Sequence, residues 1–294
     1  MPVRLFFVYV LPFVLLSFNF AEGATVQGAD NTEVSVQNPK RLVVINSSAT
    51  ETLFALGLGD RIVGTDAGST YPAVAEKLPK VGHPYRPSAE GIISLKPDLV
   101  IATEDSLPPA TAQQIRSAKI PVLVLEASDK SGVDGYKRRV RMIAKAFDIE
   151  AKAEKEIQRF EEGLKKINSS ATEGKSAKVF FLYAHGAASG RIYGTQTGPH
   201  YLIEAAGAHN AAESVEGVKD FTSEAMVKMQ PDAILVLKRV SKNLGGTEGV
   251  LKLQGISLTP AGKNKRVIEI DDSVRWIGPR FPEFAQELNT ALAK

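Results

Sequence analysis

A ten-residue segment occurs twice in this chain, and this repeat constrains the fold more than any other feature. Residues 89–98 read AEGIISLKPD and residues 223–232 read SEAMVKMQPD, and each copy runs on into apolar residues. Both copies have Glu near the start, Pro-Asp at the end and apolar positions in the same phase. The pattern indicates a helix with an acid in its first turn, ended by Pro and followed by a buried strand. Such units are common in α/β proteins, but a duplicated one predicts two similar lobes.

Strand-like segments support this division. Short apolar runs open both halves, at residues 41–45 (RLVVI) and 178–183 (KVFFLY). In the first half, further runs at 61–65, 99–101 and 122–125 alternate with helical patterns. The alternation predicts an α/β class with mainly parallel sheets in two Rossmann-like lobes.

A long amphipathic stretch, residues 140–167, separates the halves. Its apolar residues recur every three or four positions, and most of the others are Lys, Arg or Glu. This predicts one long helix, or two helices broken near Asp148. A helical connection is stiff, and ligands usually bind in clefts between lobes. We therefore expect an N-terminal lobe at 41–139, a linking helical region at 140–173 and a C-terminal lobe at 174–294.

The first 23 residues have the features of a signal peptide. A basic start precedes an uncharged apolar run at 5–20, and small residues then predict cleavage near Gly23 and Ala24. Residues 24–40 would follow as a polar lead-in. A retained membrane anchor is the alternative, but the run is shorter than the roughly 20 residues that a spanning helix needs.

Composition narrows the class of protein further. The chain has 294 residues, 44% hydrophobic and 23% charged, which indicates a globular protein and neither disorder nor a multi-span membrane protein. It contains no cysteine, so lipid modification and disulfides are excluded and the bacterial periplasm is favoured. The net charge is +3 with scattered Lys and Arg, which does not suggest nucleic acid as a partner.

Common enzyme signatures are missing from the sequence. It has no G-x-S-x-G elbow, H-E-x-x-H motif, Walker-type loop or G-x-G-x-x-G fingerprint. The four histidines form no i, i+4 pair, which argues against a preformed zinc site on a helix. We expect a binding protein rather than an enzyme, with a periplasmic metal-dependent enzyme as the remote alternative.

Several segments together resemble one family. The features above, with the tail LTPAGKNKR at 258–266 and GPR at 278–280, are similar to the haem-binding periplasmic proteins of bacterial ABC importers. These belong to a superfamily of helical-backbone binding proteins for siderophores, cobalamin and haem, and the resemblance covers residues 40–292. It implies that haem, Fe(III) protoporphyrin IX, is the transported ligand. A ferric siderophore or cobalamin is the alternative.

The resemblance also implies partners and an iron ligand. A monomer would receive haem released by an outer-membrane receptor and deliver it to an inner-membrane permease dimer with its ATPase. Residues 64–72 (GTDAGSTYP) are similar to the segment that carries the iron-ligating tyrosine, which points to Tyr71. A phenolate suits Fe(III), but a free Tyr has a pKa near 10 and needs the metal or a nearby cation to favour phenolate. In the family an Arg of the second lobe assists, and Arg239 occupies the matching place.

Further site residues follow from the same resemblance. Residues 81–90 (VGHPYRPSAE) are similar to a family segment in which the counterpart of Arg86 is a cleft arginine that could meet a propionate. His83 and Tyr85 depart from the simpler family pattern, so their part is open. His185 falls where some members place a second iron ligand or hold a second haem.

Two more features of the second half bear on function. His200 and Tyr201 replace residues that are small in the family, so they could narrow the cleft or touch the porphyrin face. By family analogy Glu90 and Glu224, one in each lobe, pair with Arg residues of the permease dimer. A first-turn acid favoured by the helix dipole explains the same two residues equally well.

Overall fold

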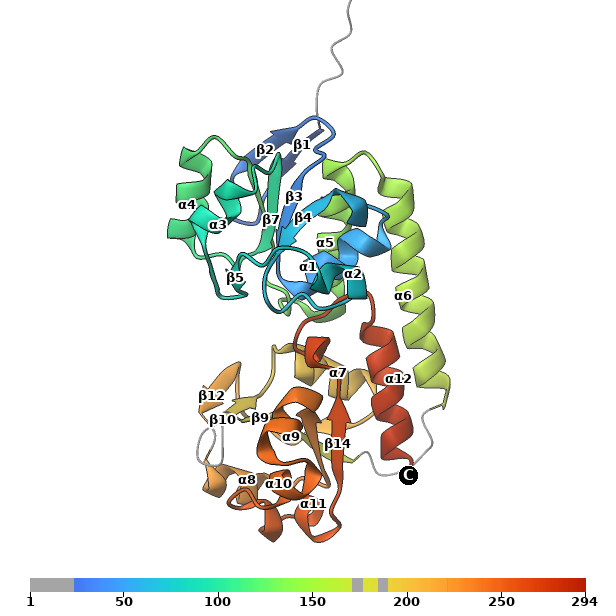
Figure 1. The fold of residues 1–294 in the computed structure, drawn as a ribbon. Helices are drawn as coiled ribbons and strands as arrows, with labels where there is room; N and C mark the ends of the chain where they lie inside the picture. The colour runs from blue at the N-terminus through green and yellow to red at the C-terminus, as the bar shows by residue number, and fades with distance from the viewer. Residues whose placement is uncertain (1–23, 171–176, 185–189, 221) are drawn as a thin grey trace, which may run out of the picture.

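The computed structural model describes residues 24–170, 177–184, 190–220 and 222–294, with the side chains of 168–170 left out. It has two α/β lobes, one above the other in Figure 1, with a long helix beside them. The prediction of two lobes is confirmed. The expected signal peptide and His185 lie outside the described residues.

The first lobe is built on a four-stranded sheet in the order β4-β3-β7-β8, and every pair in it is parallel. All four residues of β3 are buried, as expected for a parallel strand covered on both faces. The elements of this lobe are β3 Leu42–Ile45, α1 Ser47–Ala55, η1 Gly59–Arg61, β4 Ile62–Thr65, α2 Ala73–Glu76, β5 Gly82–His83, β6 Arg86–Pro87, α3 Ala89–Ser94, β7 Leu99–Thr103, α4 Pro109–Ser117 and β8 Val122–Leu125.

The second lobe has a mixed sheet in the order β12-β10-β9-β13-β14, with β11 also paired to β9. Strands β9, β11, β13 and β14 pair in parallel, whereas β10 and β12 are antiparallel. The elements are β9 Lys178–Ala184, β10 Gly190–Tyr193, α7 Gly198–Ala205, β11 His209–Asn210, β12 Val218–Asp220, α8 Ser223–Met229, β13 Ala233–Leu237, α9 Lys238–Leu244, α10 Thr247–Leu251, η2 Ile256–Leu258, α11 Pro260–Lys263, β14 Val267–Ile270, η3 Asp272–Arg275 and α12 Phe281–Leu292.

The two copies of the repeat have the same place in their lobes. Asp98, just before β7, accepts hydrogen bonds from the backbone N–H groups of Lys40 and Arg41, at 2.8 and 3.0 Å. Asp232, just before β13, accepts one from the N–H of Lys178 at 2.9 Å. Each aspartate therefore satisfies a backbone donor at the start of the neighbouring parallel strand. This explains the repeated Pro-Asp as a structural device.

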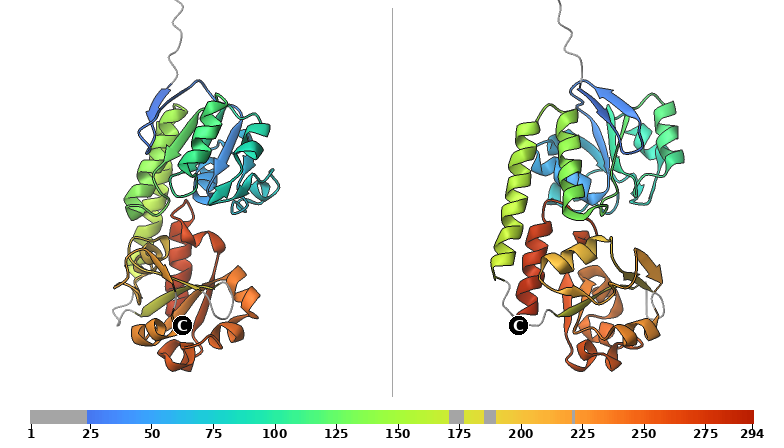
Figure 2. Two further views of the ribbon diagram at one scale, coloured as in Figure 1. Left: turned by 90° about the vertical axis from the view of Figure 1, so that its left-hand side faces the viewer. Right: turned by 180° about the vertical axis from the view of Figure 1, so that it is seen from behind.

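The connection between the lobes consists of two helices, α5 Gly132–Ala146 and α6 Glu150–Ser170. Asp148 lies between them with φ of 53°, in the left-handed region where a helix cannot continue. The predicted break near Asp148 is confirmed. Figures 1 and 2 show α6 running beside both lobes, next to α12. The exact division of the chain at residues 139 and 173 stays a prediction.

The polar lead-in forms a hairpin of β1 Ala24–Gln27 and β2 Glu33–Val36. Val26, Val34 and Val36 are buried in the core, and the N–H of Ala29 donates to the carbonyl of Val124 at 2.7 Å. Residues that looked like a lead-in are thus packed on the first lobe, because every second residue of each short strand faces inward.

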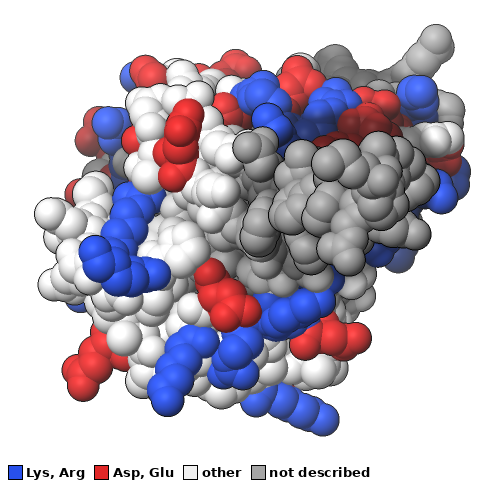
Figure 3. All heavy atoms as spheres, turned by 90° about the horizontal axis from the view of Figure 1, so that it is seen from above, with Lys and Arg blue, Asp and Glu red and all other residues white. Residues whose placement is uncertain are grey.

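The surface carries charges of both signs. Figure 3 shows Lys and Arg interspersed with Asp and Glu over the end of the first lobe, which fits their scatter in the sequence. Within the described residues, no helix is both long enough and apolar enough to cross a membrane.

Candidate ligand site at the lobe junction

The loop after β4 presents Tyr71, whose side chain is 47% exposed. Asp66 organises this loop from inside, where it is fully buried. Its carboxylate accepts hydrogen bonds from the N–H groups of Asn46 and Gly68, both at 2.7 Å, and from the hydroxyl of Ser69 at 2.8 Å. A buried carboxylate with three donors is well compensated, so the loop has a fixed geometry.

Lys80 fastens the same loop from the other side. Its ammonium donates to the hydroxyl of Thr65 at 2.9 Å and to the carbonyls of Ser69 and Ala75 at 2.7 and 2.9 Å. Burial lowers the pKa of Lys80, and the charge of Asp66 opposes that shift. The backbone on both sides of Tyr71 is therefore anchored before any ligand arrives.

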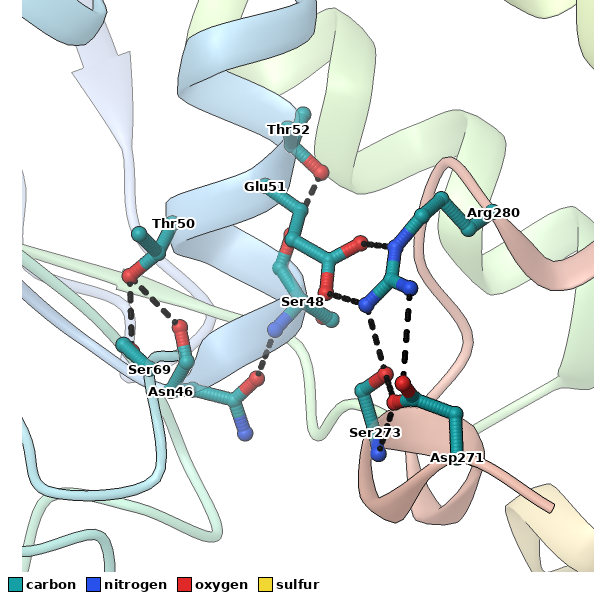
Figure 4. Close-up of polar contacts among 9 residues, drawn as sticks. All are labelled: Asn46, Ser48, Thr50, Glu51, Thr52, Ser69, Asp271, Ser273 and Arg280. Atoms are coloured by element: carbon teal, nitrogen blue, oxygen red, sulfur yellow. Dashed lines mark hydrogen bonds and ion pairs between the residues drawn. The ribbon is translucent and has the colours of Figure 1, made fainter. Parts of the chain in front are cut away.

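Arg280 is the cation beside Tyr71 (Figure 4 shows its other partners). The centre of its guanidinium lies 3.8 Å from the centroid of the Tyr71 ring, which is cation–π geometry. The same group donates to both carboxylate oxygens of Glu51 at 2.9 and 2.7 Å, and to the hydroxyl of Ser273 at 2.8 Å. A carboxylate oxygen of Asp271 lies 3.7 Å from the other Nη of Arg280. Burial raises the pKa of Glu51, and its hydrogen bonds from Arg280 oppose that rise.

Arg239, the position matched by family resemblance, contacts Tyr183 and Asp272 in this structure. One Nη of Arg239 donates to the phenol oxygen of Tyr183 at 3.4 Å, and its Nε is 3.3 Å from a carboxylate oxygen of Asp272. Its side chain is 52% exposed. Arg280 is the arginine that contacts Tyr71 in this structure, and its GPR segment gave no sign of this contact in the sequence. The assisting role expected of Arg239 stays a prediction.

His83, Tyr85 and Arg86 lie together on the exposed hairpin of β5 and β6. The rings of His83 and Tyr85 are 5.6 Å apart, and the Tyr85 ring is 6.4 Å from Trp276 of the second lobe. Burial raises the pKa of Tyr85 to about 12, against the charge of Arg275, which lowers it. Tyr85 is therefore a neutral phenol at physiological pH, suited to packing against a ligand.

The second lobe contributes an arginine that sequence reasoning missed. Arg275 stacks between two rings, with its guanidinium 4.4 Å from the centroid of Trp276 and 5.0 Å from that of Tyr183. Its Nε is buried without a hydrogen-bond partner among the described residues. Burial raises the pKa of Tyr193, and Arg275 opposes this shift too. No motif marked Arg275, because apart from the adjacent Trp276 its aromatic neighbours Tyr183 and Tyr193 come from β9 and β10, far away in the chain.

Three arginines fasten the segment between η3 and α12. Arg139 of α5 is buried and donates to the carbonyl of Ile277 at 2.9 Å, and burial lowers its pKa to about 10. Arg159 of α6 donates to the carbonyl of Pro279 at 2.7 Å. Arg280 itself binds Glu51 of α1 in the first lobe. We call the contacts of these three arginines the interlobe clasp.

The remaining candidates lie on helices α3, α7 and α8. Glu90 and Glu224 are both exposed, in the first turns of α3 and α8. Figure 1 shows these two helices in different lobes. His200 lies in the first turn of α7. The Tyr201 ring packs so close to Gly132 that a Cβ there would come within 2.8 Å of it.

The junction also contains a cavity of only about 10 Å³, lined by residues of both lobes that include Glu51, Trp276 and Arg280. Ligand pockets usually exceed about 300 Å³, so this cavity is too small to enclose a macrocycle. Among the described residues, no group of three or more His, Asp or Glu is arranged to hold a metal ion.

Comparison with known proteins decides the family. Residues 42–274 match the family described as Periplasmic binding protein. The chain belongs to this family. The apo structure of the periplasmic heme-binding protein RhuT from Roseiflexus sp. RS-1 is 35% identical, with a TM-score of 0.80, and the match covers 86% of this chain and 97% of that one. The periplasmic heme-binding protein BhuT, solved with two hemes, is 31% identical with a TM-score of 0.78, over 86% of this chain and 99% of that one.

Curated relatives of the family widen the range of ligands. The uncharacterized ABC transporter substrate-binding lipoprotein YvrC of Bacillus subtilis (strain 168) is 34% identical over 269 residues, 90% of this chain and 83% of that protein. A cobalamin-binding protein of Halobacterium salinarum is 29% identical over 217 residues, 72% of this chain and 58% of that protein. The family resemblance read from the sequence and the expected fold are thus both confirmed.

Proposed function

We propose that this chain captures ferric haem in the periplasm and delivers it to an inner-membrane ABC permease, with Tyr71 as the iron ligand. The observation that carries the proposal is a half-exposed tyrosine on an anchored loop, with the Arg280 guanidinium 3.8 Å from its ring centroid. A neighbouring cation favours phenolate, which is the form of tyrosine that binds Fe(III). The haem-binding proteins among the structural relatives support the same ligand.

The other site residues are proposed as secondary contacts. Arg86 and Arg239 are exposed cations that suit the two propionates, and Tyr85 and His83 present rings that suit the porphyrin face. His185 remains the proposed second iron ligand or contact of a second haem. Capture and release require no bond making, so we propose no catalytic activity. Glu90 and Glu224 are proposed to pair with the permease dimer, and an outer-membrane receptor to supply the haem.

A hemin titration followed by absorption tests the iron ligand. We expect wild-type protein to give a tyrosine-ligated ferric spectrum that Tyr71→Phe abolishes. Tyr85→Phe is the matched control, because it removes the hydroxyl of a second tyrosine at the junction and keeps the ring proposed to pack on the porphyrin. An unchanged spectrum in Tyr71→Phe would exclude Tyr71 as the ligand. The titration end point gives the number of haems bound.

Cobalamin or a ferric siderophore is the second candidate, which the cobalamin-binding relative favours. Trp276 is the sole tryptophan of the chain and lies at the junction, so its fluorescence should report on any ligand there. Titrations with hemin, cyanocobalamin and a ferric siderophore should show quenching at the lowest concentration for hemin. If cyanocobalamin or the siderophore quenched the fluorescence at a lower concentration than hemin, that compound would be the ligand in place of haem.

A further inference from the structure

One guanidinium serves both the contact between the lobes and the tyrosine proposed to bind iron. Arg280 and Glu51 form a two-point ion pair whose side chains are 15% and 5% exposed. The same guanidinium also packs against the Tyr71 ring, whose centroid lies 3.8 Å from the guanidinium centre. Because water screens such a site poorly, the charge on either partner of Arg280 acts strongly on Tyr71.

The charges around Arg280 compete for it (Figure 4). Glu51 comes from α1 and Asp271 from the residue before η3, and both are bound to Arg280. Glu283 of α12 acts on Glu51, and Lys238 of α9 acts on Asp271. A phenolate at Tyr71 would be a third anion on one guanidinium. Each carboxylate therefore holds Arg280 in place while it also reduces the positive charge that reaches Tyr71.

We propose that Glu51 is a positioning residue that sets how tightly ferric haem is held, acting through Arg280 without touching the ligand. This inference rests on the proposed function. It predicts opposite effects at the two ends of one ion pair. Loss of the Arg280 charge weakens the bond from Tyr71 to iron, whereas loss of the Glu51 charge strengthens it. If the ion pair only held the lobes together, loss of either charge would weaken haem binding.

Hemin dissociation, measured by transfer to excess apomyoglobin, separates these possibilities. We expect Arg280→Gln to release hemin about 10-fold faster, the size of a partly desolvated cation–π contact. Glu51→Gln should release it about 3-fold more slowly, while its amide oxygen can still accept a hydrogen bond from Arg280. Arg280→Lys keeps the charge without the two-point contact and should fall between wild type and Arg280→Gln. Both Gln variants should lower the melting temperature, because each breaks a buried ion pair.

Two further variants separate an electrostatic effect on the bond to iron from misfolding or general loss of stability. Asp271→Asn removes a carboxylate from Arg280 at a more exposed position, so it should fold even if Glu51→Gln does not, and it should also slow release. Arg159→Gln removes another interlobe hydrogen bond, from a side chain whose described partners are Glu156, Pro279 and Glu283. It should lower the melting temperature and leave the dissociation rate unchanged.

The results that would overturn the inference are distinct from failure of the proposed function. Faster release in Glu51→Gln and Asp271→Asn, or an unchanged rate in both, would show that the clasp is structural only. Equal acceleration in Arg159→Gln and Arg280→Gln would lead to the same conclusion. Failure of the proposed function appears instead as an unchanged hemin spectrum in Tyr71→Phe, and that result would overturn both.

Discussion

Asp129 should make this protein less stable at neutral pH than at mildly acidic pH. It lies at the lobe junction just before α5, close to the carboxylate of Asp105, which holds the hydroxyl of Ser128 at 2.8 Å. Burial, with a further contribution from Asp105, raises the pKa of Asp129 from 3.8 to about 6. A rise of roughly two pKa units at about 1.4 kcal/mol per unit corresponds to at most about 3 kcal/mol.

The sign follows from which state binds the proton. Between about pH 4 and pH 6 the folded protein keeps Asp129 protonated while the unfolded chain has lost that proton. The favourable contribution is therefore complete below about pH 4 and is lost as the pH rises through about 6. Asp129→Asn replaces the carboxylate by a neutral group of the same shape. It should stabilise the protein by up to about 3 kcal/mol at pH 7.5 and by close to nothing at pH 4.

Urea unfolding followed by circular dichroism at pH 4 and pH 7.5 gives the two free energies needed. Asp134→Asn, in the first turn of α5, is the matched control, because that carboxylate is exposed and paired with Lys137 at 2.8 Å. Its pKa is lowered by a hydrogen bond from Lys137, so the control should be neutral or slightly destabilising at pH 7.5. The reasoning is refuted if Asp129→Asn gives no gain at pH 7.5, or the same gain at both pH values.

Two other predictions concern the Tyr71 loop and the docking residues. Lys80→Met removes three hydrogen bonds and should cost about 1–3 kcal/mol in thermal unfolding, and it should also weaken hemin binding; an unchanged affinity would mean that Lys80 supports only the fold. Glu90→Ala with Glu224→Ala should leave the hemin spectrum unchanged and reduce stimulation of a reconstituted permease ATPase at least about 10-fold. If the double variant still stimulated the ATPase fully, Glu90 and Glu224 would have no docking role and would only stabilise their helices.

Local patterns in the sequence predicted the parts of the fold that local forces determine. The helix break at Asp148 and the first-turn glutamates each depend on residues within a few positions of one another. The repeated Pro-Asp segments were visible as a local pattern, although their aspartates bind backbone donors more than fifty residues away. The hairpin of β1 and β2 was missed because its strands are four residues each, too short to show alternation against a polar background. Its burial depends on contacts with Val124 and α5, which no local pattern contains.

The candidate site was predictable only in part for the same reason. Tyr71 was found through a segment similar to a known family, and the structure places it on an anchored loop at the lobe junction. The cation beside it could not be assigned from sequence, because Arg280 reaches Tyr71 only after the chain has crossed both lobes. Arg239 was expected to assist Tyr71, and in this structure its partners are Asp272 and Tyr183.

The interlobe clasp bears on whether either half of the chain can fold without the other. Arg139 and Arg159 belong to helices that precede the second lobe, yet they bind carbonyls close to the end of the chain. Phe160 of α6 likewise stacks on Phe281 of α12, at 6.1 Å between ring centroids. A half-length fragment would lose these partners and expose Phe160 to water. The two halves look alike, but α5 and α6 depend on partners from the last segment of the chain, so a polypeptide stopped before α12 should be cleaved by proteases faster than the full chain.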